Sequence, residues 1–156
     1  MTFLLIRPDS WDFPLFLHVA GAMLVTASLV VAVSALALAW RAEGEERAAI
    51  TRFGFRTLLI AGIPSYFLMH GAAEWIVSRE NIPSGDNEPG WVGIGYGTAD
   101  LGGILMLLAT ILAWLGARRL RSGGGGGALA KSATVLATLV VALFVIAIWA
   151  MTTKPS

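Results

Sequence analysis

Four ionisable side chains lie in or beside apolar stretches of the sequence and could carry chemistry. His70 and Glu74 are four residues apart within the apolar run 57–78, and in a helix this spacing places both about one turn apart on one face. His18 lies inside the first apolar run, and Asp100 lies at the start of the third. Ionisable groups at membrane depth are costly, so we expect these side chains to face one another or a cavity and not lipid.

The first interpretation is a b-type haem with His18 and His70 as its two axial ligands. Histidine is a common ligand of haem iron. The chain has only two histidines, so at most one such haem fits, and the absence of cysteine excludes covalent attachment. Arg79 or Arg7 would meet the propionates. The ring would be admitted by small residues, namely Gly21, Gly71, Gly102 and Gly103. This interpretation predicts a membrane electron carrier.

The second interpretation is a divalent-metal or proton-relay site formed by His18, His70, Glu74 and Asp100. A histidine and a glutamate one helical turn apart can direct both side chains at one ion, and the cores of helix bundles host such sites. Asp100 has a second explanation, because aspartate also caps helix N-termini.

In the third interpretation the same side chains bind no cofactor and hydrogen-bond across helices, which fixes helix packing. Further partners for such bonds are Ser34, Ser65 and Tyr66. All three interpretations predict that His18 and His70 share one site. They also predict Glu74 on the same side, with Asp100 across from it.

The composition is that of a membrane protein. Of 156 residues, 56% are hydrophobic and 13% are charged, whereas a typical soluble domain has about 25% charged residues. The charges are clustered and leave long apolar runs between them, which favours a membrane protein over a soluble domain with a large core. The net charge of +1 does not indicate nucleic-acid binding. The lack of cysteine excludes disulfides, thiolate nucleophiles and zinc-thiolate sites.

Four apolar runs predict an all-α membrane protein, a four-helix transmembrane bundle in a single domain. The spans are expected at about 13–40, 53–77, 98–116 and 132–151. We expect the first helix to start near Asp12 and Pro14, and Pro64 to kink the second span. The first run is longer than the apolar part of a signal peptide, so we expect it to remain in the mature protein.

The segments between the spans have distinct compositions. Residues 41–52 predict a charged connector that is partly helical. Residues 79–97 are rich in turn formers and predict a long outer loop. The glycines at 93, 95 and 97 lack the preceding strand that a nucleotide-binding loop requires. Residues 118–131 contain five consecutive glycines and predict a flexible cytoplasmic link that tolerates change.

The distribution of lysine and arginine predicts the orientation, because cytoplasmic segments carry the excess of positive charge. Eight lie in the first and third connectors: Arg41, Arg47, Arg52, Arg56, Arg118, Arg119, Arg121 and Lys131. The opposite side holds Arg7, Arg79 and Lys154. Both termini are therefore expected on the outer side. Tryptophans are expected at the membrane interfaces, with Trp40 and Trp114 inside and Trp11, Trp75 and Trp149 outside.

Two short motifs carry a resemblance. The segments Phe-Leu-His-Val-Ala-Gly-Ala-Met around His18 and Trp-Ala-Met-Thr-Thr-Lys-Pro at the end of the chain resemble small four-helix bacterial membrane proteins of unknown function. They are distantly similar to copper-resistance-D-type membrane proteins, which carry a histidine near the outer end of a helix. The methionines depart from the clusters typical of copper transport, since Met23, Met69, Met106 and Met151 are scattered.

The expected role is non-enzymatic. The chain contains no serine–histidine–carboxylate order and no phosphate-binding loop, so we expect an accessory or interaction protein of a bacterial inner membrane. Its expected partners are the lipid bilayer, other membrane proteins or a second copy of the chain.

Overall fold

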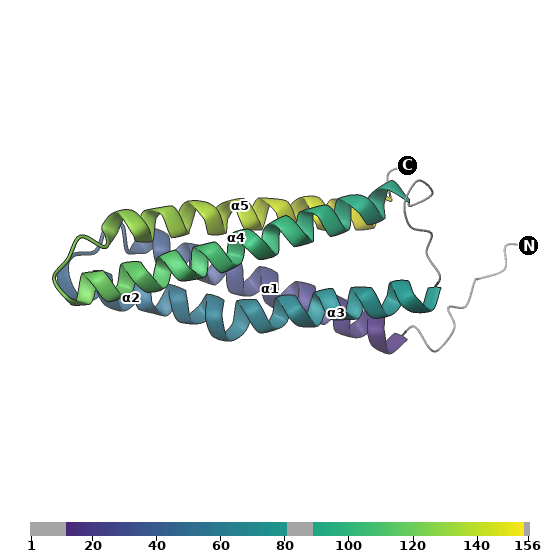
Figure 1. Ribbon diagram of the computed structural model, residues 1–156, viewed down its shortest axis with the longest axis horizontal. Helices are drawn as coiled ribbons and strands as arrows, with labels where there is room; N and C mark the ends of the chain where they lie inside the picture. The colour runs from purple at the N-terminus through teal and green to yellow at the C-terminus, as the bar shows by residue number, and fades with distance from the viewer. Residues whose placement is uncertain (1–11, 81–88, 155–156) are drawn as a thin grey trace, which may run out of the picture.

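The computed structural model describes residues 12–80 and 89–154, which form helices and no strand. The elements in order are α1 (Asp12–Leu38), α2 (Gly44–Thr57), the π-helical turn η2 (Leu58–Gly62), α3 (Ile63–Glu80), α4 (Gly90–Arg121) and α5 (Gly127–Thr153). Figure 1 shows them side by side along one long axis, with α2, η2 and α3 forming a continuous rod. The end where α1 begins and α5 ends is called the terminal end. The opposite end, with the connectors 39–43 and 122–126, is called the connector end.

Three of these helices are long and apolar enough to cross a membrane: Phe13–Leu38, Gly90–Arg121 and Gly127–Thr153. The chain is therefore a helical membrane protein, as its composition predicts. The 32 residues of α4 extend about 48 Å, more than the roughly 30 Å of a hydrocarbon core. The predicted span 53–77 is not among the three. It coincides with parts of α2 and α3 together with η2, so the π turn divides it among three elements and no single α-helix carries it.

The irregularity expected at Pro64 takes the form of the π turn that immediately precedes it. Proline has no N–H to donate, and in an α-helix its ring collides with the carbonyl group four residues earlier. The backbone here is widened, and the Ile63 N–H donates to the Leu58 carbonyl five residues before it. The π turn therefore determines which face of α3 carries His70.

The helices separate into two pairs at the terminal end. The most extensive packing is between α4 and α5, followed by that between α1 and α3, whereas α3 and α4 make few contacts. Figure 1 shows the α1–α3 pair diverging from the α4–α5 pair toward the terminal end. Toward the connector end α2 packs on both α1 and α4, so the two pairs are joined there.

A continuous apolar core links the pairs near the middle of the molecule. Its largest buried side chains come from several helices and include Leu29, Leu58, Met106, Val140 and Phe144. A smaller cluster nearer the connector end is formed by Leu36, Ala113 and Ala133. Hydroxyl groups within these helices bond to their own backbone, as Thr110 does to the Met106 carbonyl at 2.7 Å, which satisfies them without water.

The start of α4 corrects the predicted loop at 79–97. The helix begins at Gly90, so residues 90–97 are helical although four of them are glycines. Tertiary packing outweighs their weak helix propensity, because Val92 and Gly95 are buried against neighbouring elements. Asp100 lies well inside α4, and the N-cap position is Pro89, so the helix-capping explanation of Asp100 is wrong.

The glycine-rich link is shorter than the predicted segment 118–131. Since α4 continues to Arg121 and α5 begins at Gly127, only residues 122–126 connect them. Gly126 is buried, and a Cβ atom there would overlap the Gly116 carbonyl oxygen and lie 2.9 Å from Leu120 Cγ. Gly126 therefore occupies a packed position within the link that was predicted to tolerate change. Arg7, Trp11 and residues 81–88 of the predicted outer loop lie outside the described residues.

Candidate functional site

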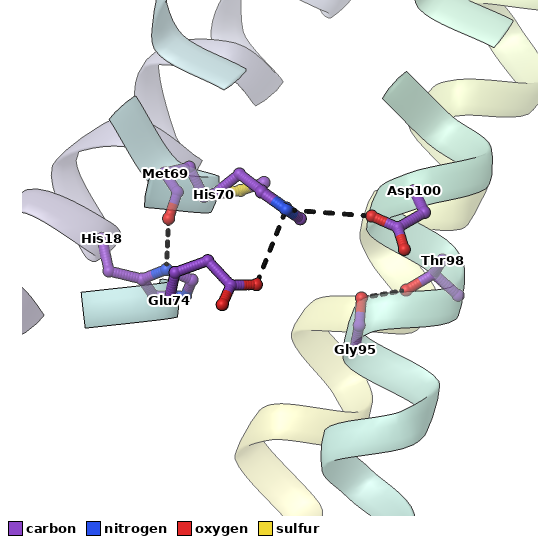
Figure 2. Close-up of polar contacts among 7 residues, drawn as sticks. All are labelled: His18, Met69, His70, Glu74, Gly95, Thr98 and Asp100. Atoms are coloured by element: carbon purple, nitrogen blue, oxygen red, sulfur yellow. Dashed lines mark hydrogen bonds and ion pairs between the residues drawn. The ribbon is translucent and has the colours of Figure 1, made fainter. Parts of the chain in front are cut away.

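His70 extends from α3 toward α4 and lies between two carboxylates (Figure 2). Its Nε2 atom is 3.8 Å from Glu74 Oε1 on the same helix and 3.9 Å from Asp100 Oδ1 on α4. These distances are too long for hydrogen bonds, but a protonated imidazole would form an ion pair with each carboxylate. The His70 side chain is 26% exposed, against 58% for Glu74 and 60% for Asp100, so the imidazole is the most sheltered of the three groups.

Two tyrosines hold the His70 ring from two helices. Tyr66, one turn earlier on α3, stacks on it with ring centroids 5.6 Å apart and planes at 20°. Tyr96 on α4 meets it edge-on at 5.9 Å and 90°. The hydroxyl end of Tyr66 rests on Gly103, where an added Cβ would be 2.5 Å from the phenolic oxygen. The two tyrosines therefore fix the position of the His70 ring between α3 and α4.

His18 on α1 has a different partner. Its Nδ1 lies 2.9 Å from the backbone carbonyl oxygen of Met69 (Figure 2). A carbonyl can only accept, so Nδ1 donates the hydrogen, and in the neutral ring Nε2 is left as an acceptor. His18 makes no other polar contact within the part of the chain that the structure describes. This bond ties α1 to α3 one residue before His70.

Both histidines border one cavity of about 60 Å³ at the terminal end, and its lining comes from α1, α3, α4 and α5. Most of its other lining side chains are small or apolar, and they include Ala22, Ala73, Gly95, Ala99, Phe144 and Met151. No hydrogen bond, ion pair or ring contact joins His18 to His70 in the described structure. The two histidines thus line one cavity, while each keeps its own partners.

The cavity does not fit a bis-histidine haem. An apolar cavity of roughly 150 Å³ is what a single benzene ring occupies, and the haem macrocycle is several times larger than benzene, whereas this cavity measures about 60 Å³. Three of the glycines expected to admit the ring are covered by protein, with Met69 backbone at Gly21, Phe144 at Gly102 and Tyr66 at Gly103. Gly71 faces open space, and Arg79 lies over the Trp75 ring at 5.3 Å.

The four residues of the predicted metal site are not assembled as one ligand set. His70, Glu74 and Asp100 lie together, but His18 is bonded to α3 backbone and pairs with neither carboxylate. Across residues 12–80 and 89–154, no three His, Cys, Asp or Glu side chains are arranged to hold a metal ion. The described residues therefore do not support the metal interpretation.

Two contributors to the site were absent from the sequence interpretation. Tyr96 belongs to the glycine-rich stretch of the predicted loop 79–97. Its aromatic side chain is the one feature of the sequence that could have marked it as a site residue. Met69 contributes a backbone carbonyl, which every residue has, so no side-chain pattern could have identified it.

Comparison of the chain with protein-family models, with curated proteins and with solved structures finds no match.

Proposed function

We propose that this chain is an accessory protein of a bacterial inner membrane, in which four helical rods cross the bilayer and the terminal end carries a proton-binding site. The observation that carries the proposal is the position of His70 between Glu74 on its own helix and Asp100 on α4. Histidine is the side chain that gains and loses a proton in the range of ordinary biological pH. The site therefore has the chemistry of a proton-operated contact between two helices.

Protonation would act where α3 and α4 make few contacts with each other. The groups that face His70 are Tyr66 and Glu74 from α3 and Tyr96 and Asp100 from α4. A neutral imidazole has little attraction for the carboxylates, whereas a cationic one attracts both and links α3 to α4. Ion pairs this exposed contribute about 1 kcal/mol or less each. Because α3 and α4 make few other contacts, these ion pairs would form a large share of what joins the two helices directly.

The spacing of charges supports four membrane crossings. No charged residue lies between Arg56 and Glu74 or between Asp100 and Arg118, and each stretch rises about 27 Å as a helix. This matches a hydrocarbon core of about 30 Å and places both carboxylates at its edge on the terminal side. Because the connector end carries most of the lysine and arginine, we assign it to the cytoplasm and the terminal end to the outer side.

An accessory role would follow because protonation of such a site changes the surface of the protein and not a substrate. Drawing α3 toward α4 would alter the surface that the terminal end presents to lipid, to a neighbouring membrane protein or to a second copy. No observation on the described residues favours the haem or the metal alternative over proton binding. The distant similarity to copper-resistance-D-type proteins remains a prediction.

The test is the pH dependence of the distance between α3 and α4. Because the chain has no native cysteine, nitroxide labels can be placed at Ser78→Cys on α3 and Gly97→Cys on α4, both exposed positions. We expect pulsed electron-paramagnetic-resonance distances in lipid nanodiscs to shorten between pH 8 and pH 5.5, the range in which histidine side chains ordinarily change charge.

The control separates His70 from general acid effects. His70→Gln keeps a polar side chain of similar reach but cannot titrate, so the distance should become independent of pH. His18→Gln should leave the pH response in place, because the His18 ring bonds to Met69 and not to a carboxylate. A response that persists in His70→Gln would contradict the proposal.

A further inference from the structure

A groove between α2 and α4 at the connector end is lined by four arginines. Arg52 and Arg56 come from α2, and Arg118 and Arg121 come from α4. The groove has a volume of about 360 Å³, and its remaining lining residues are Phe55, Trp114 and Ala117. It thus combines a cationic rim from two helices with aromatic side chains.

Among the described residues, the four guanidinium groups have no carboxylate partner. In the described part of the chain the ion pairs are those of His70, and none involves an arginine. Glu45 lines a neighbouring hollow together with Arg52 and Arg121, yet it lies beyond ion-pair distance of both. Four like charges around one hollow repel one another, so the groove is more stable when an anion occupies it.

The position of the groove along the long axis indicates which kind of anion could reach it. Arg56 and Arg118 end the two charge-free stretches described above, so they lie where the hydrocarbon core gives way to headgroups. Trp114 lies at the same level, with the Arg118 guanidinium 5.8 Å from its ring centroid. Tryptophan and arginine are the residues that hold a helix at this boundary.

We infer that this arginine groove binds the phosphate group of an anionic phospholipid. The planar guanidinium matches two phosphate oxygens at once, and basic pockets between membrane helices on the cytoplasmic side bind anionic headgroups. Phe55 and Trp114 lie beside the arginines and suit the glycerol and upper acyl region of the same lipid. The inference does not depend on proton binding by His70.

The test measures lipid binding to the full chain in detergent by native mass spectrometry. Phosphatidylglycerol, phosphatidylcholine and sodium phosphate serve as separate probes. Phosphatidylglycerol should bind at least about tenfold more tightly than phosphatidylcholine. Its affinity should fall at least about tenfold in Arg52→Gln/Arg121→Gln, because the phosphate would lose two of the four guanidinium groups that line the groove. The matched control Arg41→Gln/Arg119→Gln removes the same charge from the same end outside the groove and should change the affinity about twofold or less.

Each other outcome would overturn the inference. Equal loss in the groove variant and the control would assign binding to general surface charge. Equal affinity for the two lipids would show that the groove does not recognise an anionic headgroup. Displacement of phosphatidylglycerol by equimolar sodium phosphate would show that the ligand is the free ion and not a lipid. If the glutamine variant does not fold, Arg52→Lys/Arg121→Lys retains the charge but loses the bidentate fork. It should then bind phosphatidylglycerol several-fold more weakly, and unchanged affinity would contradict the groove.

Discussion

The contact between Gly21 and Met69 determines where both histidines lie. Gly21 on α1 lies directly against the backbone of Met69 on α3. The Met69 carbonyl accepts the His18 hydrogen bond, and the next residue in the chain is His70. A single close helix approach therefore positions one imidazole by a backbone bond and presents the other to α4.

Gly21→Ala should therefore destabilise the protein. A Cβ at Gly21 would lie 2.6 Å from the Met69 N atom and 2.8 Å from its Cα, and backbone cannot rotate aside as a side chain can. We expect the free energy of unfolding to fall by about 1–3 kcal/mol, the usual cost of overpacking. Chemical denaturation in detergent, followed by circular dichroism, would measure it.

The matched control is Gly71→Ala, two residues after Met69 on α3 and on an exposed face of that helix. A Cβ there meets nothing within 4 Å, so the substitution should be neutral or stabilise the helix by up to about 1 kcal/mol. Equal stability of the Gly21 and Gly71 variants would show that α1 and α3 are not packed as closely as described.

Among the elements, α4 and the connector after it show how packing overrides local preference. Each glycine in a helix costs about 1 kcal/mol relative to alanine, yet α4 continues through the glycines between Gly90 and Gly97. Buried Val92 and the contact of Gly95 with Met151 hold this stretch against its neighbours. The early start of α4 brings Tyr96 to the His70 ring.

The connector 122–126 should tolerate substitution at one glycine and not at another. Gly126→Ala would place a methyl group against the Gly116 carbonyl and the Leu120 side chain. We expect a loss of about 1–3 kcal/mol in the free energy of unfolding. Gly125→Ala meets nothing within 4 Å and should stay within about 0.5 kcal/mol of the wild type. Thermal unfolding in detergent would compare the two, and equal effects would contradict the packed position of Gly126.

At the scale of the whole molecule, the two ends differ in chemistry. The terminal end carries the His70 cluster and the cavity, and there the helices form two pairs. The connector end carries the arginine groove, and there α2 joins both pairs. Cationic side chains lie over tryptophan rings at both ends, as with Arg79 on Trp75 and Lys131 on Trp40.

The proposed orientation can be tested in intact cells with single cysteines and a membrane-impermeant maleimide. Glu46→Cys and Ala128→Cys probe the two ends of the connector side, and we expect neither cysteine to react with the maleimide because both lie in the cytoplasm. We expect Gly85→Cys to react. Glu46 is preferable to Arg47, because Arg47 donates a hydrogen bond to the Ala39 carbonyl and substitution would disturb that turn. Reaction at Glu46 with protection at Gly85 would reverse the orientation and leave the number of spans unchanged.

Local patterns in the sequence were enough to predict the helical membrane class and part of the site. Apolar runs bounded by charge clusters require helices, because only an internally bonded backbone is stable in lipid. The four-residue spacing of His70 and Glu74 places them on one face of any helix, and the structure confirms that they lie together. These are properties of a single segment and do not depend on its neighbours.

Tertiary structure alone decided the rest of the site. Asp100 meets His70 because α3 and α4 lie on either side of the cavity, and His18 bonds to Met69 because Gly21 admits the α3 backbone. The size of the cavity, which does not fit a haem, depends on how side chains from α1, α3, α4 and α5 fill the space between them. Helical periodicity specifies which face a residue occupies, but the close approach of small residues to other helices decides what that face meets.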